Sequence, residues 1–291
     1  MKLSVKALVA ILAVMALAAA AYFWWQQRPS ETPVPPPKVA PVQAVTPAPV
    51  AVAPEPAPPA APAPIRHPIE VIQTPAARPL TPLPALGESD KLLKDALTEL
   101  LTRKAVLSFL NMDDFVRRFV ATVDNLAQGH AASRLWPVVP TPGRFTVVER
   151  ADGTYLNDAN SDRYTPFVRF ATSVDTAKTV ALYTRLYPLF QQAYEELGYP
   201  DKYFNDRLVA VIDQLLDTPE LTEPVKLTLT QVQGPIQATQ PWLRYEFEDP
   251  ALESRPAGQK ILMRMGRANE LLLKAKLMEF RERIVKRKSS R

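Results

Sequence analysis

Proline limits where this chain can fold. Of its 291 residues, 31 are proline, and 19 of these lie between Pro29 and Pro84, where no glycine occurs. Proline fixes φ and removes an amide donor, so neither a helix nor a sheet can propagate through such a stretch. We predict that residues 29–84 form a disordered Pro/Ala-rich linker of extended polyproline II character. About 207 residues follow it, enough for one ordinary hydrophobic core.

Cysteine and histidine are almost absent, which narrows the chemistry open to the chain. There is no cysteine, so disulfides, thiolate metal sites and cysteine nucleophiles are excluded. The two histidines are His67, inside the predicted linker, and His130. A histidine-based zinc site or a Ser-His-Asp triad therefore has little support. The sequence predicts no cofactor and no metal, and it indicates no particular biochemical activity.

The N-terminus has the pattern of a membrane anchor. Residues 7–25 form an uncharged run that ends in four aromatic residues, and its length is close to the roughly 20 residues a helix needs to cross a bilayer. Lys2 and Lys6 precede the run, so the positive-inside rule puts the N-terminus in the cytoplasm. We predict a single-pass inner-membrane anchor over residues 1–28 and a periplasmic C-terminal domain. A signal peptide cleaved near Ala18–Ala21 is the alternative, and it would also export the domain.

Apolar residues recur at helical spacing after the linker. They predict a mainly α fold over residues 85–286, with about five to six helices and a basic tail over 287–291. The best-defined helix begins after Asp175 as N-cap and ends at Leu197, with Gly198 suited to the position after a helix. The other helices are expected from near Ser89, over Lys104–Leu126 with Leu107 on its apolar stripe, from Pro200 to before Pro219, and over Ala257–Lys286 with Gly266 as a point of interruption.

Two β-like patches interrupt the predicted helices. Arg144–Glu149 is rich in β-branched residues and precedes a turn-like dipeptide, which predicts a short hairpin. The second patch comprises Val225–Leu229 and Trp242–Phe247, separated by a polar insert over Gln231–Gln240. Residues Asn157–Pro166 are expected to form an irregular loop.

Seven phrases of the folded part are specific in combination: Ala121–Leu126, Arg163–Val168, Leu186–Phe190, Ala193–Pro200, Tyr203–Leu208, Ala257–Lys260 and Arg264–Gly266. Together they resemble the proteobacterial domain of unknown function 3014 family. The resemblance covers about residues 83–285 and implies an N-terminal membrane segment followed by a Pro-rich spacer, but no activity. It also implies a shorter link over residues 230–245, so the polar insert departs from the family pattern.

Two groups of polar residues are candidates for a binding surface. Asp124 and Asn125 could line a cleft as a carboxylate–amide pair, although Asp and Asn also close helices through local backbone bonds. Asn205–Arg207 lies between apolar anchors at the start of a predicted helix, and could face Arg163 and Tyr164 across a site. Ion pairs that support the fold are the structural alternative, and we favour the structural interpretation in both cases.

A third group lies on the last predicted helix. Gln259, Lys260 and Arg264 are one turn apart and could bind an anionic group such as a peptide carboxylate or a phosphate. Exposed basic residues on helices are ordinary, which is the alternative. The candidate binding surface as a whole comprises Asp124, Asn125, Arg163, Tyr164, Asn205, Asp206, Arg207, Gln259, Lys260 and Arg264.

The net charge of +5 comes from the two ends of the chain. Residues 281–291 carry six Lys or Arg and one Glu, whereas residues 85–280 carry 23 Lys or Arg and 26 Asp or Glu. Nucleic-acid binding needs a basic surface, so we predict no nucleic-acid partner. For an exported domain, anionic lipid headgroups or acidic envelope polymers suit the basic tail better.

The leading hypothesis is a membrane-anchored periplasmic protein whose domain acts in envelope interaction or scaffolding. Its predicted partners are the inner membrane, through residues 7–25, and an envelope protein or cell-wall material. The alternative is a carboxylate-dependent enzyme that acts on the cell wall, with Glu195, Glu196, Asp206 and Asp213 as its candidate carboxylates. Such an enzyme needs two carboxyl groups about 5–10 Å apart across a cleft. A small-ligand sensor with a closed apolar pocket is a third hypothesis.

Overall fold

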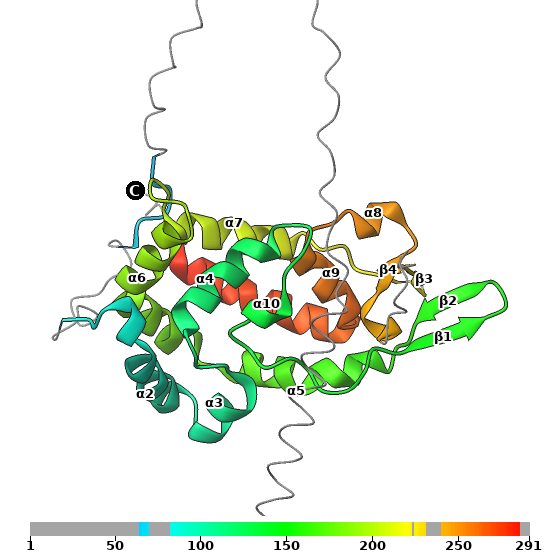
Figure 1. The fold of residues 1–291 in the computed structure, drawn as a ribbon, viewed down its shortest axis with the longest axis horizontal. Coiled ribbons are helices and arrows are strands. Elements are labelled where there is room, and N and C mark those ends of the chain that lie inside the picture. The colour runs from blue at the N-terminus through cyan, green and yellow to red at the C-terminus, as the bar shows by residue number, and fades with distance from the viewer. Residues whose placement is uncertain (1–63, 70–81, 223, 231–239, 286–291) are drawn as a thin grey trace, which may run out of the picture. The chain divides into compact units, whose positions relative to one another are not determined.

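The computed structural model describes residues 64–69, 82–222, 224–230 and 240–285. These residues contain nine α-helices and one four-stranded sheet (Figure 1). The predicted mainly helical fold is confirmed, but the expected five to six helices are too few. One predicted helix is divided in two, and α5 and α8 lie where no helix was expected. The helices are α2 (Asp90–Leu100), α3 (Arg103–Phe109), α4 (Phe115–Leu126), α5 (Asn160–Ser173), α6 (Thr176–Glu196), α7 (Phe204–Leu216), α8 (Pro250–Glu253), α9 (Ala257–Arg264) and α10 (Arg267–Ile284).

Several predicted segments fall outside the described residues. They are the anchor over residues 1–28, the polar insert except for Gln240, and the tail over 287–291. Among the residues that are described, no helix combines the length and the apolar character needed to cross a membrane. Most of the predicted linker is also outside them, but its residues 64–69 and 82–84 are described.

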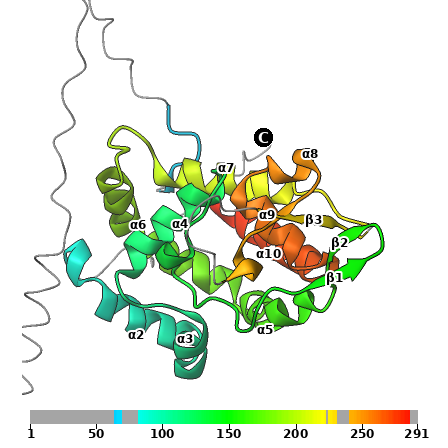
Figure 2. The same cartoon turned by 45° about the vertical axis from the view of Figure 1, so that its right-hand side comes forward.

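The main hydrophobic core lies between α4, α6, α7 and α10. α10 packs against α5, α6 and α7, and both cartoon views place it between α5 and α7 (Figures 1 and 2). Aromatic rings fill the centre, where Phe190 lies 5.4 Å from Phe119 and 6.2 Å from Phe204 between ring centroids. Ile69 belongs to this core and is 1% exposed. Residues 64–69 therefore pack with the helical domain, although they lie in the proline-rich stretch.

The helix predicted from Asp175 is confirmed. α6 follows Asp175, whose carboxylate accepts a hydrogen bond from the Lys178 amide at 3.1 Å and so satisfies a free amide of the first turn. Gly198 follows the helix with a φ of +113°, a region that favours glycine. α7 begins at Phe204 rather than at Pro200, because residues 199–203 form a turn between α6 and α7.

The single helix predicted over Lys104–Leu126 is wrong. The chain leaves α3 at Leu110, which forms an antiparallel bridge with Val138, and Asp114 adopts a left-handed φ of +54° before α4 begins. The Asp90 carboxylate, from α2, accepts hydrogen bonds from the Asp114 and Phe115 amides at 2.7 and 3.1 Å. These long-range bonds stabilise the break, and local periodicity cannot predict them.

The irregular loop predicted over Asn157–Pro166 is also wrong, because α5 begins at Asn160. The buried Asn160 side chain donates to the main-chain carbonyl of Thr146 at 2.6 Å and accepts from the Thr146 amide at 2.9 Å. This pairing fixes the start of the helix against the chain that enters the sheet. Pro166 lies inside α5 and removes one amide donor without ending it.

The two β-like patches join in one antiparallel sheet, in the order β1-β2-β3-β4. The predicted hairpin is confirmed as β1 and β2. The other side of β2 pairs with β3, where Thr154 lies opposite Leu227. Leu227 and Phe247 form a small buried cluster with Met263 of α9, which attaches the sheet to the helices. The strands are β1 (Val147–Arg150), β2 (Gly153–Leu156), β3 (Lys226–Leu229) and β4 (Tyr245–Phe247).

Gly266 separates α9 from α10, as the sequence predicts. Its φ is +81°, and a Cβ on it would lie 2.9 Å from the Ser161 Cβ. Both the left-handed backbone and the close approach to α5 therefore require glycine at this position.

Gly258 allows α9 to lie close to α4 and α7. A Cβ on Gly258 would lie 2.6 Å from Leu215 Cδ2 and 3.1 Å from the main-chain oxygen of Leu126. We expect Gly258→Ala to lower the free energy of unfolding by about 1–3 kcal/mol through overpacking, in spite of alanine's better helix propensity. Gly87→Ala is the control, because nothing lies within 4 Å of the added methyl group. Urea denaturation measures both variants, and a Gly258→Ala protein as stable as the control would contradict the prediction.

Candidate functional site

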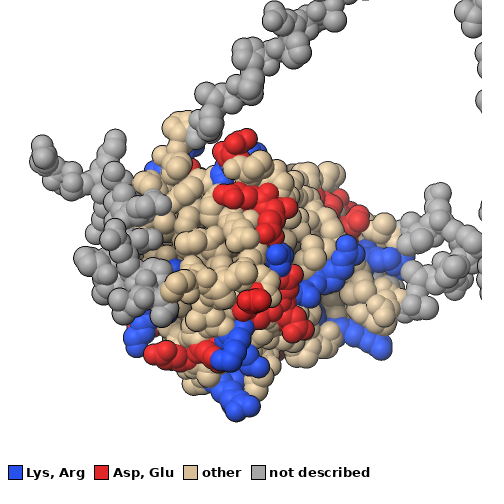
Figure 3. Space-filling model, turned by 60° about the vertical axis from the view of Figure 1, so that its left-hand side comes forward, with Lys and Arg blue, Asp and Glu red and all other residues tan. Residues whose placement is uncertain are grey.

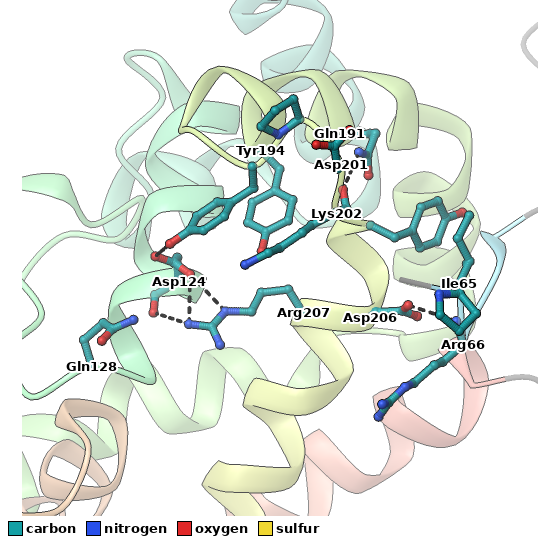
Figure 4. Close-up of a pocket in the computed structure, with 14 residues that line it drawn as sticks. Ile65, Arg66, Asp124, Gln128, Gln191, Tyr194, Asp201, Lys202, Asp206 and Arg207 are labelled. Carbon is teal, nitrogen blue, oxygen red and sulfur yellow. Dashed lines mark hydrogen bonds and ion pairs between the residues drawn. The ribbon is translucent and has the colours of Figure 1, made fainter. Parts of the chain in front are cut away.

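An open cleft of about 670 Å³ lies beside the turn between α6 and α7. Its walls come from the end of α4, the end of α6, the first turns of α7 and residues 64–66 (Figure 4). Three of the predicted site residues line it: Asp124, Asp206 and Arg207. Asn205, next to Asp206 in the chain, is buried and does not line the cleft. The structure therefore brings these three charged residues together, along with Arg66, Asp201 and Lys202, which the sequence did not single out.

Asp124 and Arg207 form the ion pair at the centre of the cleft. Arg207 Nε donates to Asp124 Oδ1 at 2.9 Å, and Arg207 Nη2 donates to the Asp124 main-chain oxygen at 3.1 Å. The Tyr199 hydroxyl donates to the other carboxylate oxygen at 3.3 Å. The Asp124 side chain is only 11% exposed, so this pair joins α4 to α7 in a partly desolvated setting. Both oxygens of the Asp124 carboxylate are already hydrogen-bonded within the protein.

Asp206 binds a segment of the chain's own proline-rich stretch. The main-chain amides of Arg66 and His67 donate to its two carboxylate oxygens at 2.9 and 2.7 Å. Figure 4 shows Asp206 directed at this segment, away from the Asp124–Arg207 pair. The amide of Ile69 donates to the Tyr203 hydroxyl at 2.8 Å. Asp206 therefore acts as an acceptor for peptide amides.

Asn205 lies beneath the same segment and is completely buried. Its Nδ2 donates to the main-chain oxygens of His67 and Ile284 at 2.8 and 3.3 Å, and its Oδ1 accepts from the Tyr183 hydroxyl at 3.2 Å. Burial raises the pKa of Tyr183 well above its ordinary value, so this hydroxyl keeps its proton and donates. The Asn205 amide is thus held in one orientation by groups that do not belong to the segment.

Two donors in the cleft have no acceptor among the described residues. The Lys202 side chain points toward Tyr194 and Arg207 (Figure 4), and its amine lies 4.7 Å from the centre of the Tyr199 ring. Burial raises the pKa of Tyr194 to about 12, so its hydroxyl stays protonated at neutral pH. Neither the Lys202 amine nor the Tyr194 hydroxyl donates a hydrogen bond to any residue in the described ranges. These two groups are available to a ligand that accepts hydrogen bonds.

Arg163 and Tyr164 do not face this cleft. Arg163 donates to the main-chain oxygens of Pro142 and Gly143 at 3.0 and 3.2 Å and so holds the loop before the sheet. Tyr164 packs against a separate cluster that includes Val168. The structure therefore separates these two residues from Asn205–Arg207, with which the sequence grouped them.

The group on α9 is committed to the fold. Gln259 Nε2 donates to the Gln214 main-chain oxygen at 2.6 Å, and the Lys260 amine donates to Glu253 Oε1 at 2.6 Å. Arg264 donates to the Tyr245 main-chain oxygen at 2.9 Å, and burial lowers its pKa. These contacts join α9 to α7, α8 and β4, which fits the structural alternative. Asn125 is half-buried and, in the described part of the chain, only its main chain forms hydrogen bonds.

A second surface is a mainly apolar groove between α3 and residues 133–140, and Lys94, Arg118 and Arg134 also line it. Leu107 and Val139 are 61% and 45% exposed on it, and the Trp136 indole nitrogen is buried without a hydrogen-bond partner in the described ranges. Leu107 was predicted to lie on a buried helix stripe, but the break before α4 leaves it at the surface. The groove has the character of a contact surface and carries no titratable pair suited to catalysis.

Sequence reasoning missed Tyr194, Tyr199 and Lys202, which line the cleft, and the docked residues 64–69. The three cleft residues gave no signal beyond helix periodicity and a turn. Residues 65–69 did give one, because Ile65-Arg-His-Pro-Ile69 breaks the Ala, Val and Pro pattern with large apolar and charged side chains. A short run of large apolar and charged residues inside a low-complexity stretch indicates a segment that packs against a folded domain or a partner.

The chain matches one family model, described as a protein of unknown function (DUF3014), over residues 115–281. The matched region runs from the start of α4 into α10 and includes Asp124, Asn205, Asp206 and Arg207. Residues 64–69, α2 and α3 lie outside it. No curated protein and no solved structure matches the chain.

Proposed function

This chain belongs to the DUF3014 family of proteins of unknown function, and from its cleft we propose that it is a non-enzymatic interaction domain of the cell envelope. One observation carries the proposal. The carboxylates of Asp124 and Asp206 accept hydrogen bonds from the described chain itself. Among the described residues, by contrast, the Tyr194 hydroxyl and the Lys202 amine, which lies over the Tyr199 ring, donate no hydrogen bond. Such a cleft is suited to holding a partner's acceptor group rather than to acid–base chemistry.

The alternative is a carboxylate-dependent enzyme, and its candidate carboxylates form ion pairs or hydrogen bonds with other residues of the protein. Glu196 lies 2.9 Å from Arg117, and hydrogen bonds from Arg117 and Gln192 hold its pKa below the ordinary value. A general acid of a glycosidase needs a raised pKa. Glu195 accepts from Gln191 at 2.9 Å, and Asp213 is paired with Arg281. Each of these carboxylates therefore has a structural role.

The open groups indicate the chemistry of the partner. Lys202 supplies a cation and Tyr194 a protonated hydroxyl, so the partner would present an acidic or carbonyl oxygen at the cleft. The apolar groove beside Leu107 offers a further contact surface on the same domain. Acidic and basic side chains both occur on the face shown in Figure 3, with the acidic ones gathered in a band across it. Residues 85–280 carry 23 Lys or Arg against 26 Asp or Glu, so nucleic acid, which needs a basic surface, is not the partner we propose.

In this proposal the domain acts at a distance from the inner membrane. Residues 7–25 would anchor the chain with its N-terminus in the cytoplasm. The part of the proline-rich stretch that precedes residue 64 would carry the domain into the periplasm, because residues 64–69 pack with the domain itself. The support for this arrangement is the uncharged, aromatic-ended run and the proline content of the stretch that follows it.

The test combines topology with site-specific crosslinking in cells. A photoreactive residue at Gln128, which lines the cleft, is expected to form an adduct with an envelope component and leaves the Lys202 amine in place. The same residue at Arg169, which is exposed on α5 and does not line the cleft, is the matched control. In spheroplasts, protease added from outside is expected to digest the domain.

Two results would contradict the proposed function. A domain protected from external protease until the membrane is broken would place it on the cytoplasmic side. Purified protein that releases soluble fragments from cell-wall material, and loses this activity in Asp206→Asn, would establish the enzyme alternative instead.

A further inference from the structure

We propose that Tyr203, Asn205 and Asp206 form a peptide-binding groove, and that residues 64–69 are its resident ligand, supplied by the same chain. A partner segment of the same chemistry would displace them. This inference rests on the proposed function and deepens it, because it names the class of segment that the interaction domain binds.

The groove recognises the main chain of its ligand. Asp206 accepts from the amides of Arg66 and His67, the Tyr203 hydroxyl accepts from the amide of Ile69, and Asn205 donates to the carbonyl of His67. The one residue between these amides is Pro68, which has no amide hydrogen to satisfy. Every amide donor from residue 66 to residue 69 is therefore used.

Side-chain selection occurs mainly at one position. Ile69 is 1% exposed and packs in the main core, whereas Ile65 is 54% exposed and Arg66 is also at the surface. The groove would thus accept a non-helical segment with two successive free amides, then proline, then a large apolar residue. The cell-envelope partner is expected to carry such a sequence.

Contacts outside residues 64–69 orient the side chain of Asn205 in the groove. Asn205 is oriented by the Tyr183 hydroxyl and the Ile284 carbonyl, and its main-chain amide donates to the Tyr187 hydroxyl at 3.2 Å. Asp206 lines the open cleft, so water can replace the two amides when the segment leaves. The pocket of Ile69 is apolar, however, and favours exchange for another apolar residue over an empty groove.

The resident segment has an advantage over free competitors because it is tethered. Residues 70–81 connect it to the domain, and a short connection gives an effective concentration on the order of millimolar. A free peptide must overcome this advantage, so only a strong or abundant partner would open the groove. Cutting the connection removes the advantage, and this is the basis of the test.

The test uses the full chain with residues 74–79 replaced by a protease recognition sequence. After cleavage, the fragment that carries residues 64–69 is expected to remain bound to the domain. A free peptide with the sequence of residues 62–72 should then displace the fragment from the cleaved protein. The peptide concentration needed to occupy the groove should be at least tenfold lower for the cleaved protein than for the uncut chain. Fluorescence anisotropy of the labelled peptide measures both affinities.

Matched variants identify the groove. Asp206→Ala is expected to weaken retention of the fragment at least tenfold, since it removes the acceptor of two amides. Asp201→Ala is the control, because Asp201 lines the same cleft and forms no hydrogen bond with the segment. Ile69→Asp lies in the released fragment and leaves the groove intact, so it tests the apolar pocket even if Asp206→Ala impairs folding.

Immediate separation of the two fragments from a folded domain would overturn this inference, as would equal retention of the parent, Asp206→Ala and Ile69→Asp fragments. Neither result depends on the crosslink at Gln128. A retained and displaceable fragment together with an absent crosslink would support the groove and count against the proposed function.

Discussion

Replacing Lys274 by methionine is expected to lower the free energy of unfolding by about 3–5 kcal/mol, the largest loss that we expect among the ion pairs of the described residues. Lys274 pairs with Glu270 at an Nζ–Oε1 distance of 2.8 Å, and the Glu270 side chain is only 1% exposed. The Lys274 amine also donates to the main-chain oxygen of Thr218, at the end of α7. Methionine keeps the length and apolar stem of lysine but leaves a carboxylate buried without its partner.

The first turn of α10 reduces this penalty without removing it. Glu270 lies near the N-terminus of the helix, where the aligned peptide dipoles favour a negative charge by about 0.3–1 kcal/mol. The double variant Glu270→Gln/Lys274→Met should therefore recover part of the lost stability, because it removes the unpaired charge.

Lys276→Met is the matched control for Lys274→Met on the same helix. Lys276 pairs with Glu279 at 3.0 Å, but the Glu279 side chain is 45% exposed, so the change should cost less than about 1 kcal/mol. Urea denaturation followed by circular dichroism measures all three variants. Equal losses for the two lysine variants would show that burial of Glu270 does not govern the energy.

Local sequence signals were sufficient where local chemistry decides the structure. Asp175 and Gly198 delimit α6 as predicted, because an N-cap acceptor and a left-handed glycine act within one turn of the helix. Gly266 separates α9 from α10 for the same kind of reason. The family resemblance is confirmed over residues 115–281.

The predictions failed where residues distant in sequence decide the structure. Asp90 caps α4 from another helix, and Thr146 fixes the start of α5 through Asn160. Neither partner lies within the window that periodicity examines. Pro166 was treated as part of a loop, but it lies inside α5, where it removes one amide donor without ending the helix.

The candidate site shows the same division. Asp124 was predicted as half of a carboxylate–amide pair, and Asn205–Arg207 as polar residues between apolar anchors. The fold brings these residues to the cleft or to the groove beside it. Arg163 was predicted to face Asn205–Arg207, and the α9 group to bind an anion, yet the partners of these residues are main-chain carbonyls and a glutamate of neighbouring elements. Polarity identifies residues that form specific contacts, but only the fold determines what they contact.

The second large effect is expected at the cleft itself. Arg207→Met should lower the free energy of unfolding by about 2–4 kcal/mol. The Asp124 side chain is only 11% exposed, and the substitution removes the cation that is paired with it. The Tyr199 hydroxyl would remain as the only side-chain donor to Asp124 in the described part of the chain. The exposed fraction of Arg207 is 26%, so water relieves part of the penalty and the loss should be smaller than for Lys274→Met.

Arg117→Met is the matched control, since Arg117 also joins two elements of the core through a carboxylate. Its partner Glu196 lies 2.9 Å away, but the two side chains are 40% and 43% exposed, so the loss should stay below about 1 kcal/mol. Raising the ionic strength should weaken the exposed Arg117–Glu196 pair more than the sheltered Arg207–Asp124 pair. Urea denaturation at low and high salt measures both effects. If Arg207→Met and Arg117→Met lose the same stability and respond equally to salt, the cleft is as open to water as the surface, and its charged groups cannot select a partner through a desolvated contact.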